Sequence, residues 1–178
     1  YGWSYPLDEI LFLYLFSKTS SLLVHSCLYE YADQGYLFCG VSGAGKTTLA
    51  GQLEKSNLDG TVLCDERNVL TCQENQFWIS STPWWGSGHY CQAKTVPLKK
   101  IIILDPSQQG LQLTPLEPLV AMEEFFKSIF LPEFCHLAMA DTVDSVENVL
   151  NLLPIAGLNY NKESADISDF LLSEVFSQ

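Results

Sequence analysis

One glycine-rich stretch restricts the fold of this chain more than any other feature of its sequence. It matches the pattern G-x-x-x-x-G-K-[ST] at every fixed position and reads Gly40, Val41, Ser42, Gly43, Ala44, Gly45, Lys46, Thr47. Such a loop requires a strand before it and a helix after it. The apolar run Tyr36 to Cys39 predicts the strand, and Lys46 to about Lys55 predicts the helix. The chain is therefore expected to be an α/β protein built around this loop.

The loop itself predicts binding of phosphate groups. Its glycines allow successive backbone N–H groups to point inward, and the following helix presents the positive end of its dipole. Lys46 would reach the β- and γ-phosphates of a nucleoside triphosphate, and the Thr47 hydroxyl would bind Mg²⁺. The expected nucleotide contacts are Gly40, Ser42, Gly43, Ala44, Gly45, Lys46, Thr47 and Thr48.

Chain length and net charge limit the number of domains and the kinds of partner. A chain of 178 residues can bury about 70% of its unfolded surface in one core, so residues 1–178 are expected to form a single domain. The formal net charge of −12 argues against nucleic-acid and anionic-membrane partners, which need a cationic face. The apolar run Ile10 to Phe16 is too short to span a bilayer. We expect a cytoplasmic protein whose six cysteines are reduced thiols.

Further elements follow from periodicity and turn chemistry. A first helix is expected from Leu7 to about Ser20, and a hairpin from Val69 to Ser80 is expected to turn at Glu74 and Asn75. The other expected strands are Leu22 to Tyr29, Thr61 to Cys64 and Ile101 to Leu104, and the other expected helices are Leu116 to Phe130, Val143 to Leu153 and Ser168 to Phe176.

A phosphate loop of this kind needs an acidic residue for the metal, and two positions compete. Asp65 ends the strand after the loop helix, where a right-handed crossover would set it beside the loop strand. Asp105 ends a more apolar strand, but Pro106 follows it, as in a turn that terminates a strand. The sequence favours Asp65, with Glu66 beside it.

An arginine and an incomplete base-recognition signature also bear on nucleotide binding. Arg67 is the single arginine of the chain, and it either contacts a phosphate or acceptor, or pairs with Glu66 or another carboxylate. The G-protein base signature N-K-x-D is incomplete, because Ser164 stands where the aspartate would follow Asn161 and Lys162. The sequence therefore does not predict a GTPase.

Three segments together resemble the C-terminal domain of the HPr kinase/phosphorylase family, which is itself similar to the P-loop of phosphoenolpyruvate carboxykinases. They are Leu22 to His25, Gly40 to Thr47 and Leu63 to Arg67. The resemblance implies a mixed sheet with flanking helices, and it implies that Lys46 and Thr47 hold nucleotide and metal. It further implies that Asp65 and Glu66 supply a metal contact and the base that accepts the hydroxyl proton. His25 would lie near the γ-phosphate.

The chain also resembles small stand-alone HPr kinase-like proteins, some of them from clusters that modify ribosomally made peptides. Tyr5 to Ile10, Thr82 to Gly86 and Val96 to Leu98 carry that likeness, while Thr47 and Thr48 replace the usual serine and glutamate. The resemblance implies an ATP-dependent kinase that transfers the γ-phosphate to a serine of a peptide or protein. The alternatives are a catalytically silent nucleotide-binding module and a small-metabolite kinase, and homo-oligomerisation is left open.

Two residue groups have a structural as well as a functional interpretation. His25 is either a core histidine or a group beside the γ-phosphate. Trp84 and Trp85 lie in a loop from Thr82 to Gly88, which suits either packing or a lid or rim for the acceptor.

Overall fold

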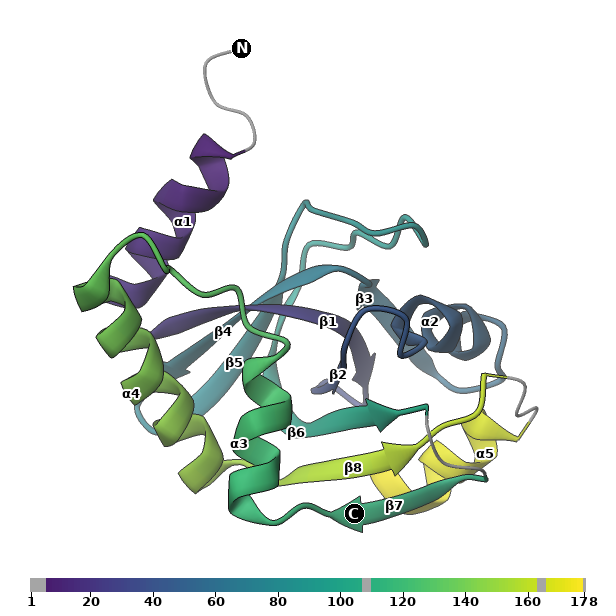
Figure 1. Cartoon of the computed structure of the whole chain (residues 1–178). Coiled ribbons are helices and arrows are strands. Elements are labelled where there is room, and N and C mark those ends of the chain that lie inside the picture. The colour runs from purple at the N-terminus through teal and green to yellow at the C-terminus, as the bar shows by residue number, and fades with distance from the viewer. Residues whose placement is uncertain (1–5, 107–109, 163–165, 178) are drawn as a thin grey trace.

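A computed structural model of the chain describes residues 6–106, 110–162 and 166–177 (Figure 1). The strands are β1 (Ser21–Tyr31), β2 (Gln34–Cys39), β3 (Gly60–Cys64), β4 (Arg67–Gln73), β5 (Gln76–Ser81), β6 (Thr95–Asp105), β7 (Gln112–Pro115) and β8 (Ile155–Asn159). The helices are α1 (Leu7–Lys18), α2 (Lys46–Glu54), α3 (Pro118–Phe126), α4 (His136–Leu152) and α5 (Ile167–Leu171), and a π-helical turn η1 (Leu172–Phe176) follows α5.

The eight strands form one mixed sheet that closes partly on itself. The order β2-β1-β4-β5-β6 returns to its start because β2 also pairs with β6. Strand β1 is antiparallel to β2, β3 and β4, whereas β2, β6 and β8 run parallel to one another. The α/β class and the mixed sheet with flanking helices are as the sequence predicts.

Two apolar cores lie on opposite faces of these strands. Residues of β1, β2, β5 and β6 pack with Phe125 and Ile129 near the end of α3 and with Val146 and Val149 of α4. Other residues of β1, β2 and β6 pack against α2, α5 and η1. Since side chains alternate along a strand, His25 points to the same face as Cys27 and Tyr29, which belong to the second core. This is the face that carries the phosphate loop and α2 (Figure 1).

Most of the expected elements are confirmed, but α4 begins at His136 rather than near Val143, and β6 begins at Thr95 rather than at Ile101. The hairpin turns at Glu74 and Asn75, both with positive φ, as a two-residue hairpin loop requires. The expected helix Leu116 to Phe130 is shorter, since α3 begins at Pro118 and its last helical residue is Phe126. Strands β7 and β8 were not predicted. In β8 the reason is that the strand is buried along most of its length and so lacks an alternating pattern.

One prediction about the sheet is wrong. Strand β3 does not lie beside the loop strand β2; β1 lies between them. The reason is that β1 and β2 form a hairpin that occupies one edge of β2, while β6 occupies the other. Strands β3 and β4 share the remaining edge of β1, the first pairing with residues 28–31 and the second with residues 21–25. The two acidic residues of the β3–β4 junction therefore lie against the middle of β1.

Candidate functional site

The phosphate loop, residues 40–45, connects β2 to α2. Gly43 and Gly45 have φ of 84° and 107°, a left-handed backbone that favours glycine. At Gly45 a side chain would also collide, because an added Cβ would lie 2.8 Å from the Tyr160 ring. The last residue of the loop, directly before the first turn of α2, must therefore be glycine unless its neighbours move.

Lys46, the first residue of α2, is buried with its ammonium group at this loop. Its Nζ donates hydrogen bonds to the backbone oxygens of Gly40 at 2.7 Å and Val41 at 3.3 Å. Burial lowers the pKa of Lys46 below its usual value. The hydrogen bonds hold the side chain across the loop, so its charge stays beside the loop backbone.

His25 reaches the loop from β1. Because Ser26 pairs with Cys39 across the β1–β2 hairpin, His25 stands opposite the start of the loop. Its Nε2 lies 3.6 Å from Oε2 of Glu66. Burial, and then the positive charge of Lys46, lower the pKa of His25, so the imidazole is neutral at pH 7.

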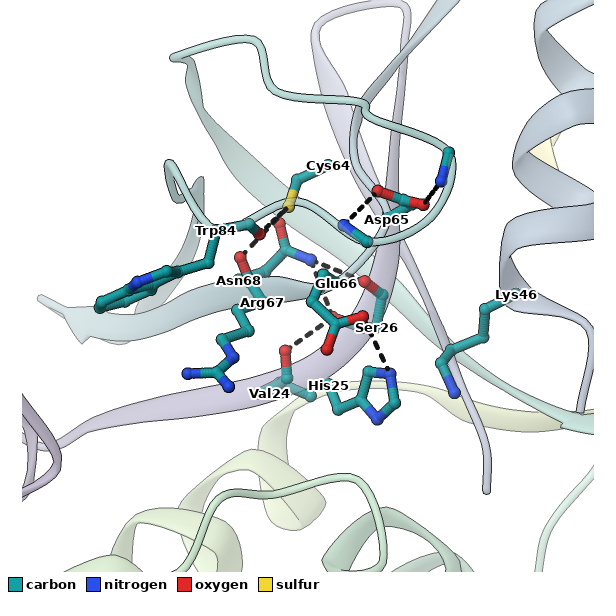
Figure 2. A network of polar contacts seen from close by, with 12 residues as sticks. Val24, His25, Ser26, Lys46, Cys64, Asp65, Glu66, Arg67, Asn68 and Trp84 are labelled. Carbon is teal, nitrogen blue, oxygen red and sulfur yellow. Dashed lines mark hydrogen bonds and ion pairs between the residues drawn. The ribbon is translucent and has the colours of Figure 1, made fainter. Parts of the chain in front are cut away.

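The two acidic residues of the β3–β4 junction point in different directions (Figure 2). Asp65 is 1% exposed, and its oxygens accept the N–H groups of Gly86 at 2.9 Å and Gly88 at 2.8 Å. The Glu66 side chain points toward His25, and its backbone oxygen accepts the N–H of Ser26. Of the two carboxylates, Glu66 is the one that faces the phosphate loop.

A pocket of about 390 Å³ joins these groups. Its lining residues are His25, Ser42, Gly43, Gly45, Lys46, Thr47, Thr48, Glu66 and Lys162. Of the expected site residues, the other three lie around it. Gly40 donates its N–H to Ser128, Ala44 is buried in the core beside α2, and Asp65 contacts the loop around Gly86 and Gly88.

Lys162 was not predicted as a site residue. It follows β8, and its Nζ donates to the backbone oxygen of Gly43 at 2.5 Å. Its own backbone oxygen accepts a hydrogen bond from Gln52 of α2, and Gln52 also accepts one from Tyr160. The sequence shows only a lysine shortly after an apolar run, and no local pattern predicts that this lysine contacts the phosphate loop.

Ser128 was also missed. Its side-chain oxygen accepts the Gly40 N–H at 3.1 Å, and its backbone oxygen accepts the His25 N–H at 2.7 Å. This buried serine thus fixes the start of the phosphate loop relative to His25. No sequence signal identified it, because residue 128 falls inside an expected helix.

Asp105, the alternative to Asp65 as the acidic residue, and Arg67, a possible phosphate contact, do not line the pocket. Asp105 ends β6, which is parallel to β2, and lines a separate hollow of about 400 Å³ that also includes Val41. Arg67 pairs with Glu9 of α1, with 2.7 Å between Nη1 and Oε2. The paired carboxylate is therefore Glu9 rather than Glu66.

The described residues also bear on membranes and metals. Among them, none of the helices has the length and apolar composition needed to cross a bilayer. They contain no cluster of three or more histidine, cysteine or carboxylate side chains suited to a metal ion. A nucleotide-bound Mg²⁺ needs fewer protein ligands, because phosphates and water complete its shell, and Thr47 in the pocket lining offers a hydroxyl oxygen for it.

Comparison with solved structures shows a likeness of fold. No family model and no curated protein matches the chain. The fold is similar to the Hpr(Ser) kinase/phosphatase from Coxiella burnetii, with a TM-score of 0.43 and 12% sequence identity over 84% of this chain and 93% of that chain. At this level of likeness, the roles of residues in this protein follow from its own site.

Proposed function

We propose that this protein is an ATP-dependent kinase, built as a single domain, that transfers the γ-phosphate of ATP to a serine hydroxyl of a peptide or protein. The observation that carries the proposal is the convergence of Lys46, Lys162, His25 and Glu66 on one pocket with the phosphate loop. The loop motif predicts the nucleotide, and the other groups supply what transfer needs beyond binding.

Two lysines support the nucleotide part of the proposal. The whole chain carries a net charge of −12, so a phosphate site must be locally positive. Lys46 and Lys162 contact backbone oxygens of the loop from opposite parts of the sequence. Both ammonium groups would neutralise charge on the β- and γ-phosphates, and the helix end and loop N–H groups would add to this.

Glu66 and His25 support the transfer part. In the proposed step the serine oxygen forms a bond to the γ-phosphorus, the bond from that phosphorus to the β,γ-bridging oxygen breaks, and ADP leaves. The serine proton passes to a carboxylate. Glu66 is favoured over Asp65 for this role because its carboxylate lines the pocket, whereas that of Asp65 is occupied by two backbone N–H groups. Neutral His25, 3.6 Å from Glu66, would orient that carboxylate.

The Thr47 hydroxyl would hold Mg²⁺ with the phosphates, and the ion would supply charge neutralisation. The second candidate function is a nucleotide-binding module without transfer. An acidic group beside the loop argues for transfer, because a silent binder has no need of a carboxylate near phosphates that repel it.

A direct experiment distinguishes the two candidates. Purified protein is mixed with millimolar ATP and Mg²⁺, its Tm is measured, and γ-labelled ATP is added with an array of serine-containing peptides. We expect a higher Tm with ATP and Mg²⁺, because a ligand that binds only the folded state stabilises it, together with labelled peptides. A Tm rise without any labelled peptide would favour the silent module, and no Tm rise would remove the nucleotide site itself.

A further inference from the structure

The loop from Thr82 to Cys91, which we call the Trp loop, is fixed to the sheet beside the candidate site. Thr82 donates its hydroxyl to the backbone oxygen of Arg67 at 2.7 Å. At the other end, the backbone of Cys91 pairs with that of Cys64 in an isolated antiparallel β-bridge, and the N–H of Gln92 donates to the backbone oxygen of Leu63. Both ends of the loop are therefore held by backbone contacts with the sheet.

Asp65 fixes the middle of the Trp loop. Each of its carboxylate oxygens accepts one backbone N–H, from Gly86 and from Gly88. The approach leaves no room for side chains, because a Cβ at Gly88 would lie 2.6 Å from Asp65 Oδ2, and a Cβ at Gly86 would lie 3.0 Å from oxygens of Asp65 and Glu66. Asp65 is thus a positioning residue that sets the loop directly over Glu66.

The two tryptophans of the Trp loop differ in their surroundings. Trp84 packs edge-on against Phe12 of α1, with 5.4 Å between ring centroids, and the Arg67 guanidinium lies over its ring at 5.6 Å. Trp85 is 53% exposed, and its ring lies beside that of His89, with 6.4 Å between ring centroids. Packing accounts for Trp84, but it does not account for Trp85.

A groove of about 310 Å³ lies between these residues and the phosphate pocket. Its lining residues are Glu66, Arg67, Pro83, Trp84 and Trp85. Glu66 also lines the phosphate pocket, so this residue lies between the two hollows. Arg67 is held by Glu9 and lies over Phe130 at 4.7 Å, which makes it a fixed part of the groove.

We propose that this groove binds the peptide segment next to the reacting serine and that Trp85 contacts an aromatic or large aliphatic side chain of that segment. The proposal rests on the proposed kinase function and names its acceptor class. An acceptor whose hydroxyl reaches Glu66 would have its neighbouring residues within reach of the groove, because Glu66 lines both hollows. The exposed indole offers a flat apolar surface suited to such a side chain. A chain of net charge −12 attracts basic rather than acidic flanking residues.

The test uses the full chain and an array of lysine-containing peptides with one serine and a single varied neighbour. With γ-labelled ATP we expect peptides with an aromatic or large aliphatic neighbour to be labelled at least about tenfold faster than those with alanine, the usual scale for filling an apolar site. Trp85→Ala should remove this preference and keep the Tm rise with ATP. Leu119→Ala is the matched control, since Leu119 is 74% exposed on α3, away from the groove, and this variant should keep the preference.

The outcomes separate the groove from the kinase function. Peptides labelled without any preference for the neighbour, or a preference that survives in Trp85→Ala, would overturn the groove and leave the kinase function standing. Absence of any labelled peptide would overturn the kinase function, and the groove with it. Asp65→Asn adds a second readout: we expect a higher KM for the preferred peptide with unchanged KM for ATP. A fall in kcat alone would mean that Asp65 acts as the base and not as a positioning residue.

Discussion

The phosphate pocket and the groove beside it share Glu66 but are built in different ways. Six of the nine residues that line the pocket fall within Ser42 to Thr48, so one short segment makes most of it. The groove joins the β3–β4 junction to the Trp loop, and side chains from α1 and the segment after α3 support it. In the proposed kinase, nucleotide binding would thus depend on local backbone, whereas acceptor binding would depend on tertiary contacts that can change independently.

The largest effect is expected at the part of the pocket that is encoded locally. Lys46→Ala removes the charge held across the loop and should abolish most of the Tm rise caused by ATP and Mg²⁺. For the native protein at a hundredfold excess of ligand over Kd, that rise reflects about 2.7 kcal/mol, or roughly 5–10 °C for a domain of this size. Lys99→Ala, an exposed lysine of β6, is the control and should keep the rise. An undiminished rise in Lys46→Ala would mean that nucleotide binds elsewhere.

The next largest effect is expected at Glu66, which lines both hollows. Glu66→Gln keeps the shape of the side chain but removes the proton acceptor, so transfer should slow by on the order of 10² or more. ATP binding, measured by titration, should change much less than transfer. Asp65→Asn serves as the matched variant in the same junction, and its kcat at saturating peptide should exceed that of Glu66→Gln. The reverse ranking would assign the base to Asp65.

The same contrast explains what the sequence could predict. The loop, its strand and its helix follow from adjacent residues, and the His25 strand was found because its apolar pattern is local too. The directions in which the Asp65 and Glu66 side chains point could not be predicted, because they depend on β3 and β4 sharing one edge of β1. Lys162 and Ser128 reach the loop through folding from far along the chain, so no spacing rule connects them to it.

A smaller effect is expected at Lys162, whose contact with the loop is more exposed than that of Lys46. Lys162→Ala should weaken ATP binding about tenfold, the size of one lost charge-assisted hydrogen bond. Because the lysine is exposed, the difference from native protein should shrink as salt is raised. Lys55→Ala, just beyond the end of α2, is the control and should bind ATP like the native protein. Equal affinity of Lys162→Ala and native protein at low salt would remove Lys162 from the site.

The smallest expected effect is a pH dependence of stability that comes from His25. Burial and the charge of Lys46 lower its pKa in the folded protein, and although Glu66 and Asp65 act the other way, the net direction is downward. In the unfolded chain the imidazole titrates near 6.5, so below that pH the unfolded state binds a proton that the folded state does not. The free energy of unfolding should therefore decrease as pH falls through 6.5 and should level off below the folded pKa.

His25→Asn should lack this part of the decrease in urea unfolding between about pH 7.5 and pH 5. His89→Asn, at an exposed position with positive φ that asparagine tolerates, should follow the native curve. If His25→Asn and native protein gave parallel curves, the imidazole would not be the neutral group beside Lys46, and its orienting contact with Glu66 would need another origin.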